Sequence, residues 1–107
     1  MNLVEQNINS IIQLCQKHRV DSLFLFGSIL TDKFRSTSDV DFLVNFEEVD
    51  LYHYFENYMN LKESLEQLLN RPVDLVEEKT ISNPFLRKSI DRNKRQIYGR
   101  ANSKMAV

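Results

Sequence analysis

The chain has 107 residues, 42% of them hydrophobic and 27% charged, which suits one compact domain. Its formal net charge of −1 argues against a general nucleic-acid-binding protein, because such proteins need an excess of basic side chains. The single cysteine, Cys15, excludes a disulfide framework, and we expect it to be a core residue. No apolar run reaches the roughly 18 residues of a membrane span, and the N-terminus lacks a signal-peptide pattern, so we expect a cytoplasmic protein.

The first half of the chain predicts a helix and two strands. Apolar residues recur at spacings of three and four over residues 2–19, which predicts one amphipathic helix. Residues 22–26 are an apolar run typical of a buried strand. A short helix or turn is expected over residues 28–34. Residues 39–46 predict a second strand, whose alternating apolar residues share one face while Asp39 and Asp41 share the other.

The second half begins with another amphipathic helix, predicted over residues 51–70. Its first turns are rich in aromatic residues. Helical spacing favours core packing for Phe55 and Tyr58, whereas Tyr52 and Tyr54 are expected to be exposed.

A third strand is predicted over residues 72–76, with Asp74 in its middle. Asn83 and Pro84 predict the N-cap and first turn of a basic helix that ends within residues 92–95. Residues 96–98 predict a last short strand. We therefore expect one domain over residues 1–98, followed by a flexible tail over residues 99–107.

Charge is distributed unevenly along the chain. Residues 85–107 contain seven basic residues and one acidic residue, a net charge of +6, whereas the other 84 residues carry a net charge of −7. A basic segment of this kind indicates either a surface for an anionic partner or for phosphates, or a solvated helix face.

Three aspartates on predicted strands indicate a metal site. Asp39 and Asp41 project in the same direction, so their carboxylates can share one cation, and Asp74 can join them from a neighbouring strand. Carboxylate oxygens suit Mg²⁺ or Mn²⁺. Zinc is disfavoured because His18 and His53 lack ligand spacing, and we expect both histidines at the surface.

Gly27 and Ser28 predict a place for phosphates. Glycine allows a tight turn and a close approach to a ligand. If a helix begins at Ser28, its free backbone N–H groups and the serine hydroxyl can donate to an anion. Phosphates held there, with a metal ion between them and the aspartates, would form a nucleoside triphosphate site.

The spacing of these motifs resembles the signature of the DNA polymerase β-like nucleotidyltransferase superfamily: Gly27-Ser28, ten residues, then Asp39-Val40-Asp41. The stretches FLFGS, SDVDFLV and RPVDLV are similar to its minimal prokaryotic branch, over residues 20–98. The resemblance implies an α+β fold, a small mixed sheet flanked by helices, and transfer of a nucleoside monophosphate to a hydroxyl. It implies that Asp39, Asp41 and Asp74 are catalytic residues and metal ligands, and that Gly27 and Ser28 bind the nucleotide.

The resemblance also implies a partner. Minimal members of the superfamily are commonly encoded beside a HEPN-domain ribonuclease toxin and act as its antitoxin, and some attach AMP from ATP to a tyrosine of the toxin. It therefore implies a HEPN toxin partner, ATP as substrate and Mg²⁺ or Mn²⁺ as cofactor. We expect no membrane and no direct nucleic-acid partner, and the oligomeric state is open. Two alternatives are an antitoxin that neutralises its toxin by binding alone, and a nucleotidyltransferase that acts on a small molecule.

The chain departs from the superfamily pattern directly after Gly27-Ser28. Many relatives have an Arg-x-Arg-Gly-like stretch there, whereas this chain has Ile29-Leu30-Thr31-Asp32. Lys33, Arg35 or the basic C-terminal helix would have to replace those arginines.

Overall fold

A mixed four-stranded sheet forms the centre of the computed structural model, which describes residues 2–99. The strands are β1 (Val20–Phe26), β2 (Val40–Phe46), β3 (Val73–Glu77) and β4 (Arg95–Tyr98), in the spatial order β3-β2-β1-β4. β1 runs antiparallel to both of its neighbours, β2 and β4, whereas β2 and β3 are parallel. This architecture confirms the predicted fold class, a small mixed sheet flanked by helices.

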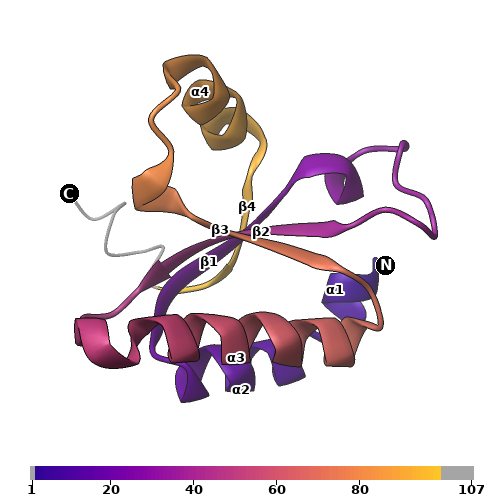
Figure 1. Cartoon of the computed structure of the whole chain (residues 1–107). Helices are drawn as coiled ribbons and strands as arrows, with labels where there is room; N and C mark the ends of the chain where they lie inside the picture. The colour runs from indigo at the N-terminus through magenta and orange to yellow at the C-terminus, as the bar shows by residue number, and fades with distance from the viewer. Residues whose placement is uncertain (1, 100–107) are drawn as a thin grey trace.

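Helices cover both faces of the sheet (Figure 1). α1 (Leu3–Gln6), α2 (Ile8–Lys17) and α3 (Leu51–Leu69) lie on one side, and α4 (Pro84–Asn93) lies on the other. Two 3₁₀ turns, η1 (Gly27–Leu30) and η2 (Glu78–Thr80), follow β1 and β3 directly. Because β2 and β3 are parallel, a crossover must join them, and α3 is that crossover.

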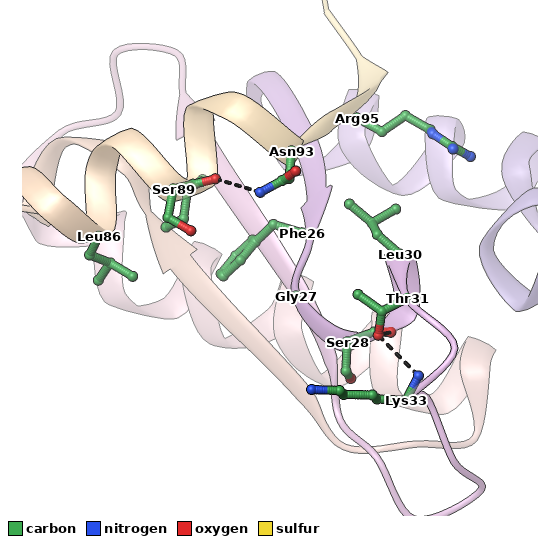
Figure 2. Close-up of a pocket in the computed structure, with 11 residues that line it drawn as sticks. Phe26, Gly27, Ser28, Leu30, Thr31, Lys33, Leu86, Ser89, Asn93 and Arg95 are labelled. Atoms are coloured by element: carbon green, nitrogen blue, oxygen red, sulfur yellow. Dashed lines mark hydrogen bonds between the residues drawn. The ribbon is translucent and has the colours of Figure 1, made fainter.

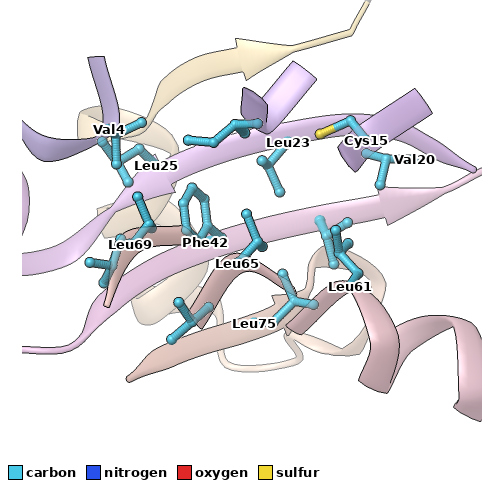
Figure 3. Close-up of a cluster of buried hydrophobic side chains, with 14 of the residues drawn as sticks. Val4, Cys15, Val20, Leu23, Leu25, Phe42, Leu61, Leu65, Leu69 and Leu75 are labelled. Carbon is cyan, nitrogen blue, oxygen red and sulfur yellow. The ribbon is translucent and has the colours of Figure 1, made fainter. Parts of the chain in front are cut away.

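The main core lies between the sheet and the helices α1, α2 and α3 (Figure 3). Alternation along β2 sends Val40, Phe42 and Val44 into this core, as the sequence predicts. The opposite face carries a smaller cluster in which Phe24 and Leu43 meet Ile90 of α4. β2 therefore presents Asp41 on the side of the sheet that α4 only partly covers.

Side-chain caps fix the starts of α3 and α4. The Asn83 side chain accepts hydrogen bonds from the first turn of α4, and Pro84 occupies that turn, as predicted. Asp50 caps the start of α3, and Asn70 ends it in the left-handed conformation.

The single N-terminal helix predicted over residues 2–19 is wrong in one respect, because the helix breaks at Asn7. The Asn7 side chain donates a hydrogen bond to the Leu3 carbonyl at 2.8 Å. Such local bonds compete with helix continuation, and asparagine makes them readily.

Two predictions for aromatic residues of α3 are also wrong. Phe55 is 72% exposed, although we expected it in the core, and Tyr54 is half-buried, although we expected it at the surface. The buried face runs through Leu61 and Leu65, and its continuation toward the N-terminus passes through Tyr58 and Tyr54. Phe55 is one residue, about 100° of helix rotation, away from that face.

The structure also tests the predictions for Cys15 and for the two histidines. Cys15 is fully buried, as predicted, and burial raises the pKa of its thiol to about 12. His53 is exposed, as predicted. His18 is buried, which corrects the prediction, and its Nδ1 pairs with the Leu14 carbonyl at 2.8 Å. The predicted tail, residues 99–107, lies outside the described residues apart from Gly99. Within residues 2–99, no helix is both long and apolar enough to span a membrane.

Candidate active site

Strand register places two of the predicted site aspartates at the same level of the sheet. Asp41 of β2 is in register with Asp74 of β3. In-register residues of parallel neighbours project their side chains to the same face, which here is the face toward α4. Asp39 comes two residues before Asp41, just outside β2, and is exposed.

The three carboxylates interact electrostatically. Burial raises the pKa of Asp41 to about 6, and the negative charges of Asp74 and then Asp39 add to the effect. Within residues 2–99, no three His, Cys, Asp or Glu side chains are grouped closely enough to form a ready-made metal site. The structure thus brings the three predicted carboxylates into electrostatic range without closing them into a preformed cluster.

Gly27 joins the aspartates to the turn after β1. Its φ of +83° lies in the left-handed region, which side chains other than glycine rarely adopt. A Cβ atom at this position would collide with Oδ2 of Asp41 and lie 3.0 Å from its Cγ. Glycine is therefore required here for two independent reasons, backbone conformation and the close approach of the Asp41 carboxylate.

Ser28 lies in η1, a four-residue 3₁₀ turn rather than the start of a longer helix. Thr31 ends this turn, because its backbone N–H and its hydroxyl both donate to the Ser28 carbonyl, at 2.9 and 2.8 Å. The predicted helix-terminal anion site is thus reduced to the Gly27-Ser28 turn itself. The Ser28 hydroxyl stays half-exposed beside it.

A cavity of about 560 Å³ opens between η1 and α4 (Figure 2). This volume is within the range of small-molecule sites. Gly27 lines the cavity and also touches Asp41, so it connects the cavity to the carboxylates. The apolar wall consists of Phe26, Leu30, Leu86 and Ile90; the polar lining adds Ser28, Thr31, Lys33, Ser89, Asn93 and Arg95.

Sequence reasoning considered the basic C-terminal helix only as a source of positive charge for phosphates, and it missed the α4 residues that line this cavity. Leu86, Ser89, Ile90 and Asn93 are spaced so that they share one face of the helix, which is a signal present in the sequence. Nothing in the sequence, however, places that face opposite Gly27.

The candidates for the missing superfamily arginines differ in position. Lys33 lines the cavity and extends past Ser28 (Figure 2). Arg35 is directed elsewhere, because its guanidinium donates to the carbonyls of Asp32 and Phe34. Arg95 lines the cavity, but its guanidinium points toward Glu5, 3.9 Å away.

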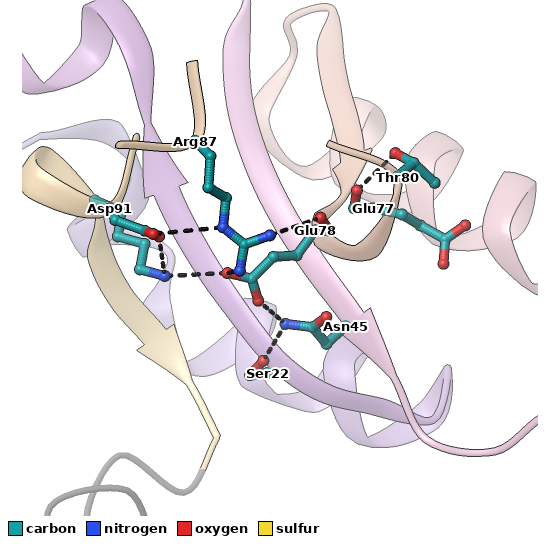
Figure 4. Close-up of polar contacts among 8 residues, drawn as sticks. Ser22, Asn45, Glu77, Glu78, Thr80, Arg87 and Asp91 are labelled. Carbon is teal, nitrogen blue, oxygen red and sulfur yellow. Dashed lines mark hydrogen bonds and ion pairs between the residues drawn. The ribbon is translucent and has the colours of Figure 1, made fainter. Parts of the chain in front are cut away.

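A buried carboxylate, Glu78, holds α4 in place (Figure 4). Its oxygens accept hydrogen bonds from Lys94 at 3.1 Å, from Arg87 at 3.4 Å and from the Asn45 side chain, which in turn donates to Ser22. Burial alone would raise the pKa of Glu78, but the bonds from Asn45 and Lys94 and the nearby positive charges lower it overall. Arg87 and Lys94, two basic residues of the segment expected to bind phosphates or a partner, thus bind Glu78 instead.

Comparison with known proteins identifies a family and several relatives. The family model for polymerase beta nucleotidyltransferases matches residues 9–103. MJ1379 of Methanocaldococcus jannaschii, provisionally named a protein adenylyltransferase, is 41% identical over 78 residues, which are 73% of this chain and 77% of that protein. Protein adenylyltransferase MntA of Thermococcus cleftensis is 34% identical over 86 residues, 76% of this chain and 84% of MntA.

Two solved structures share the fold and at least a quarter of the aligned residues. One is described as a minimal nucleotidyltransferase, with a TM-score of 0.73 and 32% identity over 89% of this chain and 95% of the other. The other is described as a toxin–antitoxin with AMP-PNP, with a TM-score of 0.70 and 25% identity over 94% of this chain and 79% of the other. These findings confirm the resemblance predicted from the sequence.

Proposed function

This chain belongs to the polymerase beta nucleotidyltransferase family, and we propose that it transfers AMP from ATP to a tyrosine hydroxyl of a HEPN-domain toxin encoded beside it. Transfer silences the toxin, which makes the chain an antitoxin. The name of the relative MntA, a protein adenylyltransferase, supports the chemistry. The related toxin–antitoxin structure with AMP-PNP supports the class of partner and of nucleotide.

The observation that carries the proposal is the contact between Gly27 and Asp41. The Asp41 carboxylate packs against a left-handed glycine, where burial and like charge both make its ionised form unfavourable. The contact does bring the turn that would hold phosphates next to carboxylates that would hold a cation. A nucleoside triphosphate needs both at once.

The cavity beside Gly27 fits the remainder of the nucleotide. In the proposal, the phosphates lie along the Gly27-Ser28 turn, where Ser28 donates a hydrogen bond and Lys33 supplies a positive charge. The base packs against the apolar wall that includes Phe26 and Ile90. An apolar wall with a few polar groups at one end is the usual chemistry of such sites.

Asp39, Asp41 and Asp74 fit Mg²⁺ or Mn²⁺ by their ligand chemistry. All three offer carboxylate oxygens, and a bound cation would offset the burial and the charges of Asp74 and Asp39 that raise the pKa of Asp41. When bound, the metal would neutralise charge on the triphosphate and on the departing pyrophosphate. These are the residues that would hold it.

The reaction requires one bond to form and one to break. The acceptor oxygen bonds to the α-phosphorus of ATP, the bond between that phosphorus and the oxygen leading to the β-phosphate breaks, and pyrophosphate leaves. The proton of the acceptor hydroxyl passes to a carboxylate, and Asp74, exposed at the start of β3, is the residue we propose for this role. Its exposure leaves room for an acceptor that another protein supplies.

The test is transfer of label from ATP. We expect label from α-labelled ATP to appear on the purified HEPN toxin in the presence of Mg²⁺, with release of pyrophosphate, and to disappear with EDTA or Asp41→Asn. Glu63→Gln is the matched control, because Glu63 is exposed and distant in sequence from the site. Toxin that stays unlabelled with the wild-type chain would refute the proposed reaction.

A further inference from the structure

Three large apolar side chains are exposed on the first two turns of α3. Leu51 and Tyr52 are each 91% exposed, and Phe55 is 72% exposed. Their spacing of one, three and four residues keeps them on neighbouring parts of the helix surface. We call these three residues the α3 patch. A cluster of exposed apolar side chains of this size marks an interaction site more often than a bare surface.

A groove continues the α3 patch toward the edge of the sheet. Its volume is about 420 Å³, and Phe55 lines it together with Tyr54, Tyr58, Leu75 and Val76. The groove lies beside β3, which is an edge strand. The patch and the groove together offer an apolar surface with a concave part, which can receive a side chain from another protein.

The rim of the α3 patch is acidic. Glu47, Glu48, Asp50 and Glu56 lie within five residues of the patch along the chain, and all are exposed. Among residues 2–99, Glu48 and Glu56 make no ion pair, and Glu47 has only a loose one with Arg19 at 3.9 Å. Asp50 is partnered, because its carboxylate contacts Nδ1 of the exposed His53 at 2.9 Å. The lysine beside the groove, Lys79, is already paired with Glu77 at 3.5 Å.

We propose that the α3 patch is the surface on which the HEPN toxin docks, through apolar side chains ringed by lysine and arginine. The proposal rests on the proposed function for the identity of the partner, and on the acidic rim for its chemistry. Complementary charge favours this occupant over two others. A second copy facing the patch symmetrically would set one acidic rim against another, and an anionic membrane would be repelled by it.

Within residues 2–99, α4 carries a surface that is both apolar and basic. Phe85 of α4 is 84% exposed, and Lys88 and Arg92 of the same helix are exposed. Contact between this surface and the α3 patch of another copy would be heterologous, and such contacts generate open chains unless the rotation closes. A closed complex with one partner therefore favours the toxin, and the mass of the free chain in solution tests the other outcome.

The α3 patch lies apart from the proposed catalytic aspartates. Asp41 is at the start of β2, whereas α3 follows the end of β2 (Figure 1). Five residues of strand separate Asp41 from Phe46, about 16 Å. A standard interface covers about 800 Å² on each partner, enough to reach from the patch to the site. The toxin can thus be held by one surface while its acceptor enters at another.

The experiment compares matched apolar substitutions. Leu51→Gln with Phe55→Gln removes two of the three apolar side chains of the α3 patch, and Phe85→Gln removes an exposed aromatic side chain of α4 as a control. We expect the double variant to bind the HEPN toxin at least tenfold more weakly by calorimetry, with unchanged ATP affinity and melting temperature. Phe85→Gln should bind the toxin as the wild type does. Glu48→Lys with Glu56→Lys should slow association and remove most of its salt dependence.

Three results would overturn the inference. These are unchanged toxin affinity in the double variant, an equal loss in Phe85→Gln, and a wild-type chain whose self-association disappears in the double variant. Failure of the proposed function looks different. In that case the wild-type chain still binds the toxin through the α3 patch, and the double variant still binds it more weakly. The wild-type chain, however, transfers no AMP.

Discussion

The carboxylate of Asp41 lies so close to the α-carbon of Gly27 that no side chain fits between them. Gly27→Ala should therefore displace Asp41 as well as strain a left-handed backbone, which alone costs about 1–2 kcal/mol. We expect a lower melting temperature and loss of AMP transfer. Gly99→Ala is the matched control, because Gly99 also has a positive φ and a Cβ there would lie 2.7 Å from the Asp21 carbonyl oxygen, yet it lines no part of the cavity. Equal loss of transfer in both variants would contradict this role for Gly27.

The charge of Asp41 should destabilise the metal-free protein at neutral pH. Its pKa is about 6 in the folded chain against an ordinary value of 3.8, so the proton is bound more tightly in the folded state. This tighter proton binding stabilises the folded state. The stabilisation is complete below about pH 4 and is lost as the pH rises through about 6. Asp41→Asn should raise the free energy of unfolding at pH 7.5 by on the order of 1 kcal/mol, since the half-buried group is partly screened by water.

Denaturant unfolding without divalent metal, at pH 4 and pH 7.5, measures this effect. The gain from Asp41→Asn should appear at pH 7.5 and vanish at pH 4. Added Mn²⁺ should stabilise the wild type and leave the variant unchanged. A variant less stable than the wild type at pH 7.5 without metal would show that the carboxylate supports the fold.

Glu78 should have the opposite pH dependence to Asp41, because its ionised form stabilises the fold. Its pKa is below its ordinary value of 4.5, so its contribution is present above about pH 4.5 and is lost as the pH falls through its lower folded value. Glu78→Gln removes the partner of two cations and should cost about 2 kcal/mol near neutral pH. Glu63→Gln, at an exposed position, should cost almost nothing. Thermal unfolding at pH 7 compares the two, and equal melting temperatures would show that Glu78 does not hold α4.

Lys33 should contribute to nucleotide affinity and Arg35 should not. Lys33→Met removes a positive charge that lines the cavity beside Ser28, and we expect about tenfold weaker ATP binding, more at low salt than at high salt. Arg35→Met removes the same charge from the next-but-one position, where the guanidinium is bonded to backbone carbonyls. Calorimetry with ATP distinguishes the two variants. Equal losses of ATP affinity would show that only the overall positive charge matters, and not the position of Lys33.

Local patterns predict most of the strands and helix ends correctly. Alternation along β2 is enough to place Asp41 on the face opposite Phe42, and Asn83-Pro84 is enough to locate the start of α4. These features depend on neighbours within a few residues. The register of Asp41 with Asp74 is different, because it depends on which strands pair and is visible only in the sheet.

Other features of the site could not be predicted because they depend on distant packing. The burial of Glu78 is invisible in a sequence where Glu77 precedes it, since two adjacent glutamates indicate a solvated turn. Its burial requires Asn45 of β2 to meet Arg87 of α4 and Lys94, the residue that caps the end of α4.

The most direct test of AMP transfer asks whether the toxin stays silent after it has been separated from this chain. HEPN toxin is incubated with the chain, ATP and Mg²⁺, purified away under denaturing conditions and refolded, and its intact mass and ribonuclease activity are then measured. We predict toxin that carries added AMP and stays inactive after wild-type treatment, and unmodified, active toxin after treatment with Asp41→Asn. Toxin that regains full activity at unchanged mass after wild-type treatment would contradict the account, and the chain would then be an antitoxin that acts by binding alone.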